Sequence, residues 1–374
     1  MDSGTETPSP LIPGSGEKKK GAFCRTIWPL AGRVVLLFGP GDRILSRRRF
    51  LNFEQAIQLV EEEMKAVEAD MAKNFFSEIA MIPTVSRYLI SSGGKRFRPL
   101  LLLLSARLCG HSGPRAIPLA SSIEFIHTAT LLHDDVVDRA FLRRGLASAN
   151  SVYGDGASVL VGDFLFTKAF SMIVQEGNLR ILEVVSNTTT RMAEGEVLQL
   201  TRMGNPETTE EDYRYVVINK TAVLISAACQ IGGILGGVPE EKEKSLAAFG
   251  LNLGIAFQLM DDTLDYISEE KTLGKTIGKD LSEGKVTLPL IHTLRTSPAG
   301  GQERLRAVIR NQDRTEGDLR LVMQAVRDSG GIDYTVMRAT DYVKQAQKFL
   351  SIFSPTPERE ALLAISDYTL KRKK

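Results

Sequence analysis

The stretch LLHDDVVDRAFLRRG, at residues 131–145, joins the end of a long apolar run to a group of carboxylates and a basic pair. The carboxylates belong to Asp134, Asp135 and Asp138. Residues four apart lie on the same face of a helix, so Asp134 and Asp138 should point the same way. The pattern therefore predicts an apolar helix that ends in an acidic face.

A second stretch of this kind, QLMDDTLDY at residues 258–266, supplies Asp261, Asp262 and Asp265. Carboxylates close to an apolar core must be paired or must bind a metal ion. A hard divalent cation such as Mg2+ prefers carboxylate oxygens and keeps positions open for water and substrate phosphates. A solvated helix end would explain one such cluster equally well, but two clusters, each behind an apolar run, favour a magnesium site.

Composition narrows the choice of fold and partner. The chain has 374 residues, 43% of them hydrophobic, and its net charge of +2 gives no general attraction to nucleic acid. The three cysteines lie far apart, which argues against a disulfide framework and fits a cytoplasmic protein. No uninterrupted apolar run reaches the ~20 residues of a membrane span. Apolar residues recur at helical spacing and strand-like alternation is scarce, so we expect an all-α fold.

Residues 1–50 differ from residues 51–374, and we expect a boundary between them. Residues 1–16 are rich in Ser, Thr, Pro and Gly and should be disordered, while residues 18–49 are strongly basic around a short apolar patch. A solvated tail or a misplaced start codon is the favoured interpretation. The alternatives are a transit peptide, against which the acidic residues near the start argue, and a signal peptide, against which the short and late apolar patch argues. A third is a basic arm that contacts anionic lipid at a membrane surface.

Basic residues also occur among glycines and inside apolar helices. GGKRFRP, at residues 93–99, places cations at the start of an apolar helix, which suits a phosphate group. The loop KTLGKTIGKDLSEGK, at residues 271–285, has the composition of a mobile lid. Lys220 and Thr221 lie in mid-helix, and His127 is two helical turns before the first aspartate cluster. Each feature alone is also explained by a surface turn, a solvated loop or a satisfied core residue.

Taken in this order, GGKRFRP, DDVVD, RRG, KT and QLMDD resemble the motifs of the trans-isoprenyl diphosphate synthase family, from roughly Phe53 to the C-terminus. The stretch IEFIHTATLLHDDVVD is most similar to the octaprenyl diphosphate synthase branch. The resemblance implies an isoprenoid synthase-type helical bundle around a central cavity, generally as a homodimer. It implies Mg2+-dependent condensation of isopentenyl diphosphate with an allylic diphosphate such as farnesyl diphosphate, with three ions per site. A product of about octaprenyl length, for a quinone side chain, is expected.

The resemblance also implies roles for individual residues. The metal ligands would be Asp134, Asp138 and Asp261, and the outer shell around them would be Asp135, Asp262 and Asp265. Isopentenyl diphosphate would be held by Lys95, Arg98, His127 and Arg144. The allylic diphosphate would be held by Arg143, Lys220, Thr221, Gln258 and Lys275. The residues that act most directly in catalysis would be Asp134, Asp138, Asp261, Lys220 and Arg143.

Product length can be considered from helix geometry. In the family the growing tail runs down the helix of the first aspartate cluster, and at ~1.5 Å per residue the fifth position before Asp134 lies about 7.5 Å below it. That position is Ala129, next to Thr130, and the next ring is Phe125. Short-chain relatives fill this depth with an aromatic side chain, so we expect an open tunnel and a long product. A side chain from another helix that closes the tunnel is the alternative.

Other functions fit the sequence less well. A non-catalytic partner subunit of a heteromeric synthase usually lacks one carboxylate cluster, and both are intact here. A class I terpene cyclase would lack the GGKRFRP site for a second diphosphate. A His-Asp metal phosphohydrolase would need more histidine ligands than His111, His127 and His292 supply.

Overall fold

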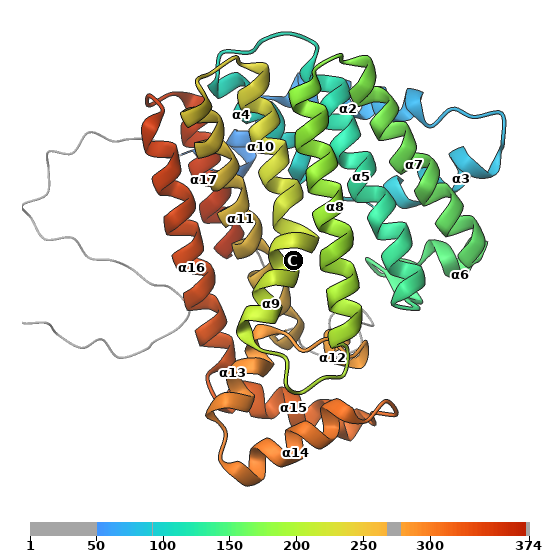
Figure 1. Cartoon of the computed structure of the whole chain (residues 1–374), viewed down its shortest axis with the longest axis vertical. Coiled ribbons are helices and arrows are strands. Elements are labelled where there is room, and N and C mark those ends of the chain that lie inside the picture. The colour runs from blue at the N-terminus through green and yellow to red at the C-terminus, as the bar shows by residue number, and fades with distance from the viewer. Residues whose placement is uncertain (1–50, 92, 268–277, 372–374) are drawn as a thin grey trace, which may run out of the picture. The chain divides into compact units, whose positions relative to one another are not determined.

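In a computed structural model of the chain, residues 51–91, 93–267 and 278–371 are described. These residues are mostly helical, so the predicted all-α fold is confirmed (Figure 1). The N-terminal extension, residues 1–50, lies outside the described residues, as do Lys271 and Lys275 of the lid. The boundary expected near residue 50 therefore stays a prediction.

The first half of the bundle has short helices followed by long ones. In chain order they are α1 (Phe53–Gln58), α2 (Glu61–Asn74), α3 (Met81–Ser91), α4 (Phe97–Leu108), α5 (Ala116–Val137), α6 (Ala149–Tyr153), α7 (Asp155–Gln175) and α8 (Leu179–Arg202). Between α5 and α6 the chain forms a hairpin of two short antiparallel strands, β1 (Leu142–Arg143) and β2 (Leu146–Ala147).

The second half begins with a helix that changes its winding. It consists of α9 (Glu210–Val216), a π-helical turn η1 (Val217–Ala222) and α10 (Val223–Leu235). The remaining elements are α11 (Glu240–Ile267), α12 (Lys279–Ser282), α13 (Leu288–Thr296), α14 (Ala299–Arg310), α15 (Glu316–Asp328), α16 (Gly331–Phe349), the 3-10 turn η2 (Leu350–Ile352) and α17 (Pro357–Lys371).

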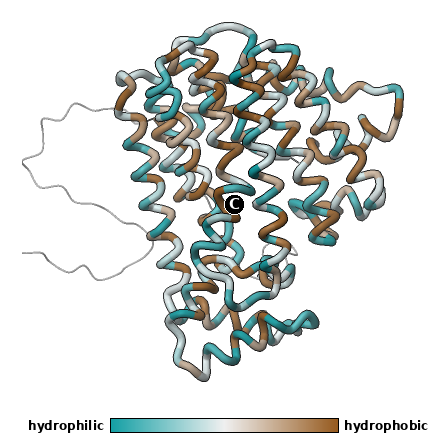
Figure 2. The backbone as a smooth tube through the Cα atoms, in the orientation of Figure 1, coloured by the Kyte–Doolittle hydropathy of each residue, from teal (hydrophilic) through white to brown (hydrophobic). Residues whose placement is uncertain are grey.

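Helix α10 is apolar along nearly its whole length and packs against α4, α8 and α11. A helix that is hydrophobic all round belongs in a core, and hydrophobic residues recur along the long helices of the bundle (Figure 2). Gly232 allows α10 to approach α4 closely, because a Cβ there would lie 2.6 Å from the backbone nitrogen of Ala106. Gly254 allows α11 to approach η1 in the same way, because a Cβ there would lie 2.6 Å from the Cα of Ala222. These approaches bring η1 and α11 together next to the site.

Residues 53–76 have the amphipathic pattern of one helix, but the structure divides them into α1 and α2. Helix α1 starts with a capping box in which the Asn52 side chain accepts from the Gln55 backbone nitrogen at 2.8 Å. The chain leaves helical geometry at Val60, which has φ −125° and ψ 24°. Val67 and Met71 of α2 still point into the core, so the apolar pattern identified the buried face and missed the break.

The β1–β2 hairpin places two arginines just beyond the end of α5. Its turn residues, Arg144 and Gly145, both have positive φ, at 53° and 80°. Two-residue hairpins of this kind require positive φ at both positions, and glycine at the second adopts it without strain. The pairing of Arg143 with Leu146 closes the turn, so the directions of Arg143 and Arg144 are set by the hairpin.

Candidate active site

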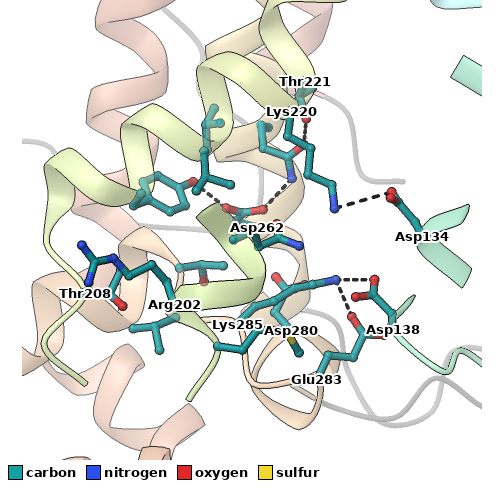
Figure 3. A pocket seen from close by; sticks show the side chains of 18 of the residues that line it. Asp134, Asp138, Arg202, Thr208, Lys220, Thr221, Asp262, Asp280, Glu283 and Lys285 are labelled. Atoms are coloured by element: carbon teal, nitrogen blue, oxygen red, sulfur yellow. Dashed lines mark hydrogen bonds and ion pairs between the residues drawn. The ribbon is translucent and has the colours of Figure 1, made fainter. Parts of the chain in front are cut away.

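A cavity of about 240 Å³ lies between α5, α8, η1, α11 and the segment 279–287 (Figure 3). Its wall carries carboxylates and cations beside apolar side chains. The residues of the predicted site on this wall are Asp134, Asp138, Arg143, Lys220, Thr221 and Gln258. Further charged residues on the wall include Asp262, Lys279, Asp280, Glu283 and Lys285. The two aspartate-rich stretches, far apart in the sequence, therefore contribute to one cavity.

Two lysines reach across the cavity to carboxylates in the last turn of α5 and at its C-cap. Lys220 Nζ lies 3.5 Å from Asp134 Oδ2 and 2.5 Å from Glu196 Oε2. Lys285 Nζ donates to Asp138 Oδ2 and to Glu283 Oε2, each at 2.7 Å. Burial raises the pKa of Asp134 to about 6, while Lys220 opposes this rise. Because burial is the main cause of this rise, a further cation beside Asp134 would favour its charged form.

The three carboxylates of the second aspartate cluster lie in different surroundings. Asp262 is buried and lies on the cavity wall, where burial raises its pKa to about 7. Asp261 is exposed and lies outside the set of wall residues, and its charge acts on Arg98. Asp265 accepts from the backbone nitrogens of Lys279 and Asp280, at 3.2 and 3.1 Å. The structure thus brings Asp262 nearer to the cavity than the sequence suggested, and the assignment of Asp261 as a ligand stays a prediction.

The π-helical turn η1 aims two consecutive side chains, Lys220 and Thr221, at the same cavity. In an α-helix neighbouring residues point about 100° apart, and an inserted π turn widens the helix locally, often at functional sites. Gly195 of α8 makes room, because a Cβ there would stand 2.8 Å from the Lys220 backbone nitrogen. On the side of η1 that carries Asn219, Arg191 Nε donates to Asn219 Oδ1 at 2.9 Å. The position of η1 is therefore fixed by its contacts with Arg191 and Gly195 of α8.

A directed chain of hydrogen bonds leads from the cavity into the core. Thr221 Oγ1 donates to Gln258 Oε1 at 3.0 Å, and Gln258 Nε2 donates to Asp262 Oδ1 at 2.8 Å. Tyr213 Oη donates to Asp262 Oδ2 at 2.5 Å. Because the Thr221 proton is committed to Gln258, the lone pairs of its hydroxyl are left for a partner with positive charge.

A second cationic group lies beside the β1–β2 turn. A Cβ on Gly94 would meet Arg144 Nη1 at 3.0 Å and Arg96 Nη1 at 3.2 Å, so both guanidinium groups lie over this glycine. The pKa of His127 is lowered well below its ordinary value by burial and by the charges of Arg98, Arg143, Arg144 and Arg96. Positive charge is therefore concentrated where the sequence predicted an anion.

Two predicted phosphate-binding residues are occupied with other partners. Lys95 Nζ contacts the Tyr368 hydroxyl and lies 4.8 Å from the centre of the Tyr368 ring. Arg143 Nε donates to Asp135 Oδ2 at 2.7 Å, so the buried Asp135 carboxylate orients this arginine. Lys275 lies outside the described residues.

The residues predicted to set product length are buried in α5. Ala129 has no exposed surface, and Thr130 Oγ1 donates to the His127 carbonyl oxygen at 2.8 Å. Further along, the Phe125 ring contacts Phe75 of α2, with centroids 5.0 Å apart. Neither Ala129 nor Thr130 is on the wall of the cavity, so the open tunnel below Asp134 stays a prediction.

Several residues of the site were not assigned a role from the sequence. Lys285 could have been suspected, because it belongs to the lysine-rich loop. Glu196 and Tyr213 sit on ordinary amphipathic helices, and no local pattern distinguishes them. Asp280 follows Gly278 closely in the chain, and burial with the charges of Asp262 and Asp265 raises its pKa well above its ordinary value. Their roles depend on tertiary contacts.

The side chains on the wall suit an open magnesium site. Within the described residues no three His, Cys, Asp or Glu side chains form a closed metal cluster, but Mg2+ commonly binds one or two carboxylates together with substrate phosphates. Asp138 Oδ1 is buried and accepts no hydrogen bond from the described part of the chain. Such an oxygen costs free energy, and a divalent cation beside Asp134 and Asp138 would offset that cost.

Comparison with known proteins agrees with this geometry. The polyprenyl synthetase family model matches residues 79–326. The chain is 42% identical to the octaprenyl diphosphate synthase of Escherichia coli (strain K12), over 86% of this chain and 99% of that protein. It is 40% identical to an all-trans-nonaprenyl-diphosphate synthase (geranyl-diphosphate specific) of Rhodobacter capsulatus, over 86% and 99%. A crystal structure of polyprenyl synthase from Caulobacter crescentus CB15, complexed with calcium and isoprenyl diphosphate, superposes with a TM-score of 0.84 at 40% identity and covers 87% of this chain and 100% of that one. The chain therefore belongs to the polyprenyl synthetase family.

Proposed function

We propose that the protein is an all-trans polyprenyl diphosphate synthase, a prenyltransferase that adds isopentenyl diphosphate to an allylic diphosphate. The observation that carries this proposal is the presence of two separate places for an anionic head group. One is the cavity between Asp134, Asp138, Lys220 and Lys285. The other is the set of arginines beside Gly94, Arg96 and Arg144 with the nearby Arg98, which we call the arginine group. Among the contacts of the described residues, none favours the alternative of a non-catalytic partner subunit.

The cavity suits the allylic diphosphate, whose carbon–oxygen bond must break. Lys220 and Lys285 lie where they can donate to its phosphate oxygens, and Asp134 and Asp138 would hold Mg2+. Bound magnesium would neutralise the charge that develops on the departing diphosphate. Preorganised donors of this kind stabilise a transition state without further rearrangement. Calcium in the Caulobacter relative supports a divalent cation here, and we propose three ions per site.

The residues next to this head-group site protect the reacting carbon. Leu131, Val216 and Val217 give the wall apolar surface, which excludes water from the allylic cation. Thr221 lines the same space, and its hydroxyl donates to Gln258. The double bond of isopentenyl diphosphate, held by the arginine group, attacks the cation, and loss of a proton restores the alkene.

The proposal is tested with the purified full-length protein, farnesyl diphosphate and radiolabelled isopentenyl diphosphate. We expect prenyl diphosphates to form when Mg2+ is present and not in excess EDTA. Mass analysis of the prenyl alcohols released by phosphatase gives the chain length, for which we propose about eight isoprene units. Absence of incorporation with farnesyl and geranyl diphosphate as primers would refute the enzymatic assignment.

We further propose that the protein is a homodimer. Helix α7 is apolar, and Leu160 is 69% and Val174 59% exposed. Phe141 and Leu142, before and in β1, are 80% and 51% exposed. Exposed apolar surface of this kind is most simply covered by a second copy of the chain. Light scattering should give twice the chain mass of 41.1 kDa, and Leu160→Glu should give a monomer.

The contact of residues 1–50 with anionic lipid stays a prediction, because these residues lie outside the described part of the chain.

A further inference from the structure

Glu124 of α5 is a buried carboxylate next to the arginine group. Its residue surface is 5% exposed, and Oε1 lies 3.5 Å from Arg96 Nη1. Oε2 is buried and accepts no hydrogen bond within the described part of the chain. A buried charge with so few hydrogen bonds is stabilised mainly by the positive charges around it. Those charges are the arginines that the proposed function assigns to a diphosphate.

The arginines respond to Glu124 as a shared counter-ion. Burial lowers the pKa of Arg98 and of Arg144, and the charge of Glu124 opposes the lowering at both. Arg96 and Arg144 converge over Gly94, and Arg96 is also held by the Ile90 carbonyl oxygen at 3.2 Å. Arg143 is already paired with Asp135. Glu124 is thus in contact with Arg96, and its charge also acts on Arg98 and Arg144, with Asp261 as a further negative charge near Arg98.

We propose that Glu124 is a positioning residue that holds these arginines together when no anion is bound and limits how tightly they bind a diphosphate. The proposal rests on the proposed function in that it places a diphosphate at the arginine group. An incoming diphosphate gains the attraction of the arginines and meets the repulsion of the Glu124 carboxylate. This balance keeps the group assembled yet lets the ligand leave.

The effect of removing the charge can be estimated. A unit charge several ångströms from a diphosphate, at the effective dielectric constant of a half-buried site, changes the affinity by about tenfold or more. Glu124→Gln keeps the shape and one acceptor oxygen for Arg96. It removes the repulsion between the Glu124 carboxylate and the diphosphate. It also leaves the positive charge of the arginines uncompensated, so the affinity for diphosphate should rise.

The first experiment measures the binding of inorganic pyrophosphate by calorimetry in EDTA, where metal-assisted binding at Asp134 and Asp138 is suppressed. We expect Glu124→Gln to lower the Kd about tenfold. Glu243→Gln is the matched control, because Glu243 is also buried and pairs with Arg180 at 2.9 Å, and it should leave the Kd unchanged. Arg98→Ala should weaken binding and reduce the effect of Glu124→Gln, which locates the anion at the arginine group.

Steady-state kinetics supply the readout that a purely structural role would not change. In Glu124→Gln the KM for isopentenyl diphosphate should fall about tenfold while the KM for the allylic diphosphate stays the same. Weaker or unchanged pyrophosphate binding, or an equal change in both KM values, would overturn the role of Glu124. If the wild type transfers no prenyl group but the pyrophosphate results hold, the proposed function fails and the anion site stands.

Discussion

Lys285 and Asp138 are separated by 147 residues in the chain and form an ion pair of 2.7 Å across the cavity. Lys285 also contacts Glu283 at 2.7 Å. Burial alone would lower the pKa of Lys285, but the two carboxylates outweigh burial and raise it, so this lysine is charged at any physiological pH. It connects the segment 279–287 to the first aspartate cluster and supplies positive charge at the place where a diphosphate would arrive.

Replacing Lys285 should therefore impair the binding and ionisation of the allylic diphosphate. Lys285→Met removes a charge-assisted hydrogen bond, worth about 1.5–3 kcal/mol, so kcat/KM for the allylic diphosphate should fall about 10- to 100-fold. Lys244→Met is the control, since Lys244 is exposed and pairs with Glu240 on the surface of α11. Initial rates at varied primer concentration measure the effect. A loss of the same size in Lys244→Met would show that the lysine at 285 has no special part.

The orientation of the Lys220 side chain toward the cavity should depend on the absence of a side chain at Gly195. A Cβ at Gly195 would stand 2.8 Å from the Lys220 backbone nitrogen and 2.9 Å from Asn219 Cβ, so Gly195→Ala must displace the π-helical turn. We expect kcat to fall about tenfold or more, although alanine is the better helix former. Gly156 of α7 has nothing within 4 Å of an added Cβ, and Gly156→Ala should keep full activity. Normal kinetics in Gly195→Ala would mean that η1 tolerates displacement.

Asp134 and Asp262 should make the metal-free protein less stable as the pH rises. Burial raises the pKa of Asp134 to about 6 and that of Asp262 to about 7, from an ordinary value of 3.8. A carboxyl group with a raised folded-state pKa binds its proton more tightly when folded, so its contribution to stability is full below about pH 4 and is lost as the pH passes through the raised values.

Calorimetry in EDTA should show the Tm of the wild type falling between about pH 4 and pH 7, the range between the ordinary and the raised pKa values. The fall should be smaller in the variant that carries both Asp134→Asn and Asp262→Asn. Only the slope with pH is compared, because the amides also alter hydrogen bonds. Parallel slopes in the two proteins would assign the pH dependence to other groups.

The sequence was sufficient for the parts of the site that follow local rules. Helical spacing placed Asp134 and Asp138 on one face of α5, and apolar periodicity identified the all-α fold. The π-helical turn could not be foreseen, because an α-helical pattern points Lys220 and Thr221 in different directions. The pairing of Asp138 with Lys285, and the closer approach of Asp262 than of Asp261 to the cavity, depend on how distant segments pack. No spacing within one helix encodes such contacts.

Product length should respond to the side chain at position 129. Ala129 lies one turn and a half below Asp134 with no exposed surface, so Ala129→Phe places a ring on the expected path of the tail and should shorten the main product. Overpacking alone costs about 1–3 kcal/mol, and Ala120→Phe, at a buried position earlier in α5, controls for that cost. It should lower the Tm without changing the product. Mass analysis of the prenyl alcohols decides the matter, because an unchanged chain length in an active Ala129→Phe enzyme would show that the tail does not pass this residue.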